Sequence, residues 1–262
     1  MDINARLQKL TRLGLAVRGL LYIVVGLLVV TTGRAEDPSG ALQYLGEGGG
    51  KLLLIVLTAG LLAYSIWRLS DAAFDIERHG SDRKGVMQRV GAAASGVVHL
   101  LLSWQAIRLI QGVVSAGDGT RDGARTALQL PAGGALVIAG GAVLLAAGFV
   151  QLVNALRARF LRHLEPRIAR QPWALWSGRA GYAARGCVFL ISGFFLVLAG
   201  LDERASEAGG TAQALTWLDS PFDIVVAFGL LAFGAFGLIE ARYRILSEVP
   251  ADQLLHRATS RL

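Results

Sequence analysis

The chain has 262 residues, of which 53% are hydrophobic and only 17% are charged, and its formal net charge is +7. Soluble domains carry about 25% charged residues, so this composition argues against a soluble globular protein. Apolar runs of about 20 residues recur along the chain, which is the length that a helix needs to cross a bilayer. The runs are continuous rather than alternating, which excludes a β-barrel. A single cysteine, Cys187, excludes an intrachain disulfide.

Taken in order, the apolar runs predict an all-α membrane protein with six transmembrane helices. The spans cover residues 13–33, 52–70, 90–110, 133–153, 180–200 and 222–241. Basic residues followed by the first apolar span are also the pattern of a secretory signal peptide. The same run recurs deep in the chain, however, so we interpret the first span as a retained helix.

The six spans fall into three copies of a two-helix unit, residues 10–78, 86–160 and 176–245. Their first helices align at Gly19, Gly96 and Gly186, and their connecting loops align as ALQYL, ALQLP and ALTWL, which predict short amphipathic helices. Their second helices align as GLLAYSIWRLSDA, VLLAAGFVQLVNA and GLLAFGAFGLIEA. Three blocks in the same order indicate internal repeats. Two helices per unit make the repeats parallel, which predicts a pseudo-threefold bundle within one membrane domain, residues 1–262.

The chain resembles the bacterial domain-of-unknown-function family 1206 in three motifs. These are the RxGYxARG opening of the unit, its ALxxL loop, and an acidic residue followed by alanine near its end. The resemblance covers about residues 10–245 and implies three tandem two-helix units. The middle copy departs from the pattern, because Ser95 replaces the arginine and Asn154 replaces the acid. The resemblance implies an architecture and no catalytic residues.

The distribution of Lys and Arg predicts the orientation of the chain. The N-terminal segment, the second loop, the fourth loop and the C-terminal tail hold three, four, six and four of them, whereas the other loops together hold five. We therefore expect a multi-pass protein of the bacterial plasma membrane with both termini in the cytoplasm. This topology accounts for most of the positive charge, so we expect no nucleic-acid partner.

Four charged residues lie within or at the cytoplasmic ends of the spans. Arg18 and Arg185 each lie six residues, or about 9 Å, beyond an interfacial arginine. Corresponding positions of the three repeats hold Arg18 with Asp71, Ser95 with Asn154, and Arg185 with Glu240. We predict that Arg18 pairs with Asp71 and Arg185 with Glu240, within one hairpin or across to a neighbour, and that Ser95 and Asn154 form a neutral counterpart. The charges are either a structural clamp or a ring that binds an anion or relays protons.

Glycines recur every seven residues on two of the first helices, at Gly19, Gly26 and Gly33 and at Gly186, Gly193 and Gly200. This spacing places small residues along one stripe of a helix, where they allow helices to approach closely in a membrane. The alternative is a narrow pore whose wall needs small side chains.

His99 lies near the middle of the third span and shares a helix face with Ser95 and Ser103. Tyr22 and Phe189 occupy its position in the other repeats. We interpret it as a neutral, hydrogen-bonded histidine in an aromatic layer, and the alternative is a proton-handling or ligand site. No second His, Cys or acid has metal-ligand spacing from it, so we expect no metal site.

The fourth loop combines arginines with Phe160, Leu161, Leu164 and Ile168 at helical spacing. This pattern is typical of a segment that lies on an anionic membrane surface, and the alternative is docking of a cytoplasmic partner.

Common hydrolase, metalloprotease, nucleotide-binding and redox motifs do not occur in the sequence. We therefore expect neither an enzyme nor a cofactor, but a structural or interaction protein in contact with membrane lipids. A protein partner or a homo-oligomer is compatible with this role. The alternative is a small channel or transporter for an anion, a proton or a small solute.

Overall fold

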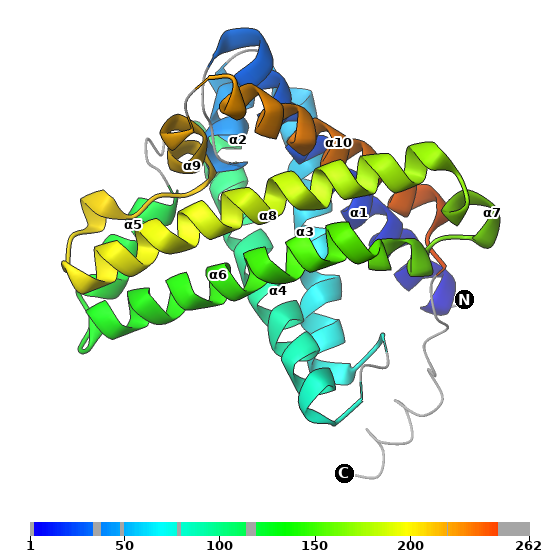
Figure 1. Cartoon of the computed structure of the whole chain (residues 1–262), viewed down its shortest axis with the longest axis horizontal. Coiled ribbons are helices and arrows are strands. Elements are labelled where there is room, and N and C mark those ends of the chain that lie inside the picture. Colours follow the sequence, from blue (N-terminus) through cyan, green and yellow to red (C-terminus); the bar gives the residue numbers. More distant parts are fainter. Residues whose placement is uncertain are drawn as a thin grey trace.

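The computed structural model describes residues 3–33, 38–47, 50–77, 80–113, 119–218 and 220–245. Its long helices are α1 (Ile3–Thr32), α3 (Lys51–Phe74), α4 (Arg83–Ile110), α6 (Gly133–Arg157), α8 (Pro172–Leu201) and α10 (Phe222–Tyr243) (Figure 1). All six contain a segment long and apolar enough to cross a membrane. No β-strand occurs in the described part of the chain, apart from one isolated bridge between Leu164 and Arg244. The predicted all-α architecture with six candidate spans is confirmed.

Short helices connect the long ones. The loops inside the three repeats contain α2 (Pro38–Glu47), α5 (Gly119–Leu128), and η2 (Ala205–Glu207) with α9 (Thr211–Trp217). The loop between the second and third repeats contains η1 (Arg159–His163) and α7 (Pro166–Ala169). The ALxxL motifs give these connections an apolar face, since Ala41, Leu42, Ala214 and Leu215 are all buried.

The closest helix packing joins neighbouring repeats rather than the two helices of one repeat. The pairs α1 with α10, α4 with α3, and α8 with α6 make the most extensive contacts. The first helix of each repeat thus packs on the second helix of the preceding repeat, and the third repeat precedes the first in this cycle. Figure 1 shows α6 and α8 side by side, running across α3 and α4.

Glycines make these contacts between repeats. A Cβ added to Gly19 would lie 2.7 Å from the backbone oxygen of Gly234, and one on Gly96 would lie 2.7 Å from Cγ of Leu69. The remaining members of the predicted stripe are close to the facing helix in the same way: Gly26 to Ala227, Gly186 to Gly148, Gly193 to Gly141 and Gly200 to Gly134. Close backbone approach is the packing mode that membrane helices use in place of hydrophobic burial.

Gly33 does not belong to this stripe, so its predicted packing role is wrong. A Cβ there would meet nothing within 4 Å, and its φ is +64°. Gly33 instead follows the end of α1 in the left-handed conformation that glycine adopts without steric cost.

Two of the three repeats also pack their own helices together. A Cβ on Gly14 would lie 2.7 Å from Cβ of Tyr64, and Gly181 approaches Phe233 at the same position of the third repeat. The middle repeat has Ala147 in place of the aromatic residue, and a Cβ on Gly91 would meet nothing within 4 Å. Within the described ranges, α4 and α6 do not pack along their lengths. The six helices therefore follow the neighbour order of a threefold ring that is open between α4 and α6, and we call this opening the α4–α6 seam.

Candidate functional site: a charge network between the first and last repeats

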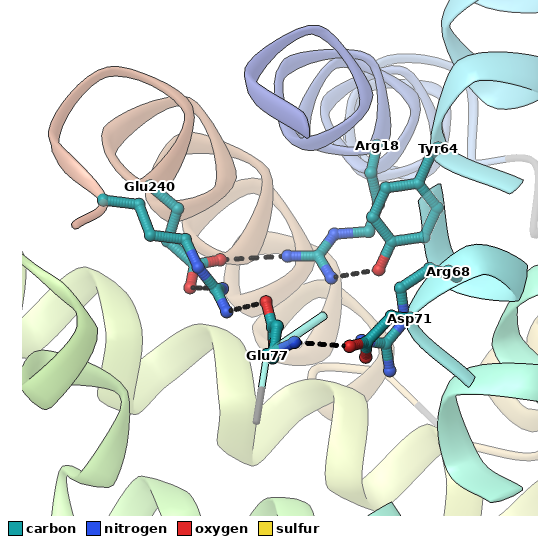
Figure 2. A network of polar contacts seen from close by, with 7 residues as sticks. Arg18, Tyr64, Arg68, Asp71, Glu77 and Glu240 are labelled. Atoms are coloured by element: carbon teal, nitrogen blue, oxygen red, sulfur yellow. Dashed lines mark hydrogen bonds and ion pairs between the residues drawn. The ribbon is translucent and has the colours of Figure 1, made fainter. Parts of the chain in front are cut away.

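Arg18 of α1 lies at the centre of the interior charges. Its Nη2 forms an ion pair with Oε2 of Glu240 at 3.0 Å, and its Nη1 donates a hydrogen bond of 3.1 Å to the hydroxyl of Tyr64 (Figure 2). The side chain of Arg18 is 12% exposed and that of Glu240 is 3% exposed, so the ion pair is buried. The predicted pairing of Arg18 with Asp71 is not formed, and Arg18 instead joins α1 to α10.

Glu240 also binds a second arginine, because Arg244 follows it by one helical turn. Arg244 Nη1 lies 3.3 Å from Oε1 of Glu240, and Arg244 Nη2 lies 2.9 Å from Oε1 of Glu77. Burial alone would lower the pKa of Arg244, but the carboxylates of Glu240 and Glu77 outweigh it and raise that pKa. Arg244 and Glu77 were not predicted as site residues, although the spacing of four residues from Glu240 to Arg244 indicates an ion pair.

Asp71 serves the turn between α3 and α4 instead of α1. Its Oδ1 accepts a 2.7 Å hydrogen bond from the backbone N–H of Glu77, and its Oδ2 lies 3.5 Å from Nη1 of Arg68 (Figure 2). The Asp71 side chain is fully buried. Asp71 therefore holds in place the segment that carries Glu77 to Arg244.

The cyclic packing of the repeats explains why the predicted partners are exchanged. Because α1 packs on α10, Arg18 meets the acid of the third repeat. Because α4 packs on α3 and α8 packs on α6, Ser95 belongs to the interface that contains Asp71, and Arg185 to the one that contains Asn154. Only one of the three interfaces therefore combines an arginine with an acid at these positions.

Arg185 lies among aromatic rings rather than beside Glu240. Its guanidinium carbon is 4.6 Å from the ring centre of Phe189, 4.9 Å from that of Phe233 and 5.5 Å from that of Tyr22. Its Nε is buried and makes no hydrogen bond. Across the described residues Arg185 forms no ion pair, so the predicted pairing with Glu240 is wrong. Cation–π contacts stabilise such a guanidinium by about 0.5–2 kcal/mol each, but they do not neutralise its charge.

Three arginines cap the C-terminal ends of the helices that face them. Each arginine lies on the first helix of a repeat and donates to backbone oxygens near the end of the second helix of the preceding repeat. Arg12 donates to Ala241 at 2.9 Å and to Arg242 at 2.6 Å. Arg89 donates to Ala72 at 2.9 Å and to Ala73 at 3.1 Å, and Arg179 donates to Leu156 at 3.5 Å. A cation at a helix C-terminus satisfies free carbonyl groups and interacts favourably with the helix dipole. This capping role was not predicted from the sequence, because it depends on which helices face each other.

His99 lies in an aromatic layer beside the network. Its Nδ1 is 2.7 Å from the backbone oxygen of Ser95, and its ring centre is 4.5 Å from that of Tyr64. Because a carbonyl oxygen only accepts, Nδ1 carries the proton and Nε2 keeps its lone pair in the neutral ring. Ser103 donates to the backbone oxygen of Leu100 at 2.8 Å and does not bond to His99. The aromatic environment agrees with the neutral interpretation, and a ligand or proton site at His99 stays a prediction.

The fourth loop turns its apolar side chains toward the protein. Phe160, Leu164 and Ile168 are buried in one cluster with Ala174 and Phe236. The backbone N–H of Glu165 also donates to the oxygen of Tyr243 at 3.0 Å. The prediction that these apolar side chains lie on a lipid surface is wrong, while contact of the loop's arginines with anionic lipid stays a prediction. Among the residues that the structure describes, no group of three His, Cys, Asp or Glu residues is able to hold a metal.

Comparison with known proteins agrees with this repeated architecture. The chain is 30% identical to the Uncharacterized protein YxxB of Bacillus subtilis (strain 168) in an alignment 251 positions long that covers 91% of each chain. No solved structure matches it significantly. The model of one family matches three segments, residues 13–75, 90–158 and 180–244, each inside one of the predicted repeats. The chain belongs to the family described as Domain of Unknown Function (DUF1206).

Proposed function

We propose that the chain is a structural or interaction protein of the bacterial plasma membrane, with both termini in the cytoplasm and without catalytic activity. The excess of Lys and Arg in alternate loops and the Bacillus relative support this location. The contact between Arg18 and Glu240 carries the proposal, because it uses interior charges to join the first repeat to the last.

Charges on a transport pathway normally face a water-filled cavity or the transported ion. In this network the carboxylates of Glu240 and Glu77 and the guanidinium groups of Arg18 and Arg244 bind one another. Their hydrogen-bonding groups are thus used to hold three helices, α1, α3 and α10, in one arrangement. A scaffold for other membrane components needs this rigidity.

Reconstitution into vesicles tests the proposal. Vesicles that contain the purified chain should release protons, chloride and phosphate no faster than protein-free vesicles. Faster release that persists after further purification would contradict the structural role.

The second candidate is a small channel or transporter for an anion, a proton or a small solute. The observation that favours it is the charge of Arg185, which has no carboxylate partner among the described residues, together with the lone pair on Nε2 of His99. This candidate predicts that any release falls in His99→Ala and Arg185→Gln. The exposed Phe194→Ala variant is the matched control.

Cysteine labelling tests the orientation. With Cys187 replaced by alanine, a membrane-impermeant maleimide added to intact cells should label Arg125→Cys in α5. It should leave Arg170→Cys in the fourth loop unlabelled until the cells are opened. The opposite pattern would place both termini outside.

A further inference from the structure

We propose that Arg185 binds the headgroup of an anionic lipid that enters from the bilayer through the α4–α6 seam. The inference goes beyond the structural role, and it rests only on the chain being embedded in a membrane. Its starting point is an imbalance of charge in the interior. Arg18, Arg68 and Arg244 each have a carboxylate within 3.5 Å, whereas Arg185 has none in the part of the chain that the structure describes.

The repeats show what the surroundings of Arg185 lack. Arg18 lies where α1 meets α10, next to a ring (Phe233) and an acid (Glu240) that are separated by seven residues. Arg185 occupies the same position where α8 meets α6, and there the alignment has Ala147 for the ring and Asn154 for the acid. Both an apolar group and a negative charge are therefore missing from one face of α6.

Contacts along the helices confirm that these two positions correspond. A Cβ on Gly19 would approach Leu238 of α10 at 3.1 Å, and one on Gly186 would approach Leu152 of α6 at 2.8 Å. Leu238 and Leu152 align in the repeats, so α8 packs on α6 in the same register as α1 on α10. The positions of Ala147 and Asn154 relative to Arg185 thus follow from those of Phe233 and Glu240 relative to Arg18.

The α4–α6 seam gives a lipid access to this face. In the other repeats, an aromatic side chain from the second helix closes the hairpin against a glycine, as Tyr64 does at Gly14. In the middle repeat Gly91 meets nothing, and Val143 is 60% exposed. Of the six spans, α4 and α6 are also the least buried, at 28% and 22%.

The chemistry of Arg185 favours a phosphate headgroup. A guanidinium presents paired N–H donors that match phosphate oxygens, and it carries its charge at every physiological pH. The guanidinium carbon lies 4.6 Å from the ring centre of Phe189 and 4.9 Å from that of Phe233, and Nε is buried without a hydrogen-bond partner. The aromatic rings cannot accept as an anion does, so this donor is available to one. Arg185 lies about 9 Å along α8 from Arg179, a depth that a lipid phosphate reaches by a modest displacement from the interface.

Lipid-dependent stability of the delipidated full chain in neutral detergent tests the proposal. Phosphatidylglycerol should raise the unfolding temperature saturably and more than phosphatidylcholine does. In Arg185→Gln the apparent affinity for phosphatidylglycerol should fall roughly tenfold or more, because a charged hydrogen bond is lost. Arg125→Gln, which removes an exposed arginine of α5, should bind as the wild type does.

Asn154→Asp provides a variant that keeps Arg185 and is decisive if Arg185→Gln does not fold. An aspartate at this position supplies the carboxylate of the other repeats, so the lipid-free chain should become more stable and should lose the response to phosphatidylglycerol. The proposal is overturned if Asn154→Asp responds as the wild type does, or if Arg185→Gln keeps full affinity. It is also overturned if phosphatidylcholine is equally effective, or if inorganic phosphate alone gives the whole shift. These outcomes do not depend on the release of ions from vesicles. The lipid site and the structural role can therefore be disproved separately.

Discussion

Arg18 and Glu240 are 222 residues apart in sequence, and their side chains form a 3.0 Å ion pair that joins the first repeat to the last. The pair lies at the interface where α1 packs on α10, so it closes the cycle of repeats on the side opposite the α4–α6 seam. A chain of three similar units has no covalent link between its first and last members. The ion pair supplies a specific noncovalent one.

Glu240→Gln should be one of the most destabilising single changes in the chain. The change removes the carboxylate that neutralises the buried guanidinium groups of Arg18 and Arg244. Breaking a buried ion pair in this way costs about 3–5 kcal/mol. Equilibrium unfolding in mixed micelles measures the loss. Glu165→Gln is the control, because the pair of Glu165 with Arg167 is exposed and should contribute less than about 1 kcal/mol. Equal losses for the two variants would contradict the network.

Gly19→Val and Gly91→Val should differ sharply in stability, although both glycines lie on the first helix of a repeat at positions that are glycine in all three repeats. A side chain at Gly19 collides with the backbone of Gly234, and overpacking costs about 1–3 kcal/mol or more. Gly91 faces the open seam, so valine there should change the unfolding free energy by less than about 1 kcal/mol. A large loss in Gly91→Val would show that α4 and α6 do pack together.

Arg89→Met should weaken the end of α3. Arg89 donates to the last turn of that helix, and a cation at a helix C-terminus contributes about 0.3–2 kcal/mol. Hydrogen exchange of the amides near Phe74 should increase. Arg83→Met, which changes an exposed arginine at the start of α4, should leave that exchange unaltered, and the same increase in both variants would refute the capping role.

His163 should make stability depend on pH. Partial desolvation first, and the nearby charge of Arg244 second, lower the pKa of His163 below its usual value of about 6.5, while the side chain keeps contact with solvent. The unfolded chain therefore binds this proton more readily than the folded chain, and stability should be lost as the pH falls below about 6.5. Unfolding temperatures at pH 7.5 and 5.5 should differ less in His163→Gln than in the wild type. An unchanged difference would contradict the lowered pKa.

Much of this architecture is predictable from the sequence, because it depends on local patterns. Apolar length predicts the spans, and the alignment of Arg18 with Arg185 and of Asp71 with Glu240 identifies the positions of the interior charges. The partners of these charges are not local. Whether Arg18 meets Asp71 or Glu240 depends on which helices face each other, and the repeats look the same in either arrangement.

The fourth loop and the middle repeat show two further limits of the sequence. Phe160 and Leu164 have the spacing of a membrane-surface segment, but an apolar face packs equally well on a protein cluster. The opening between α4 and α6 depends on Ala147, and its significance emerges only when Tyr64 and Phe233 are seen to close the other two repeats.

The most direct test of the cyclic packing compares two double-mutant cycles that share Arg18→Gln. One cycle combines it with Glu240→Gln and the other with Asp71→Asn, and both are measured by unfolding in mixed micelles. The structure predicts a coupling of about 1 kcal/mol or more between Arg18 and Glu240, and a coupling below about 0.5 kcal/mol between Arg18 and Asp71. A larger coupling of Arg18 with Asp71 than with Glu240 would contradict the closure of the first repeat onto the last.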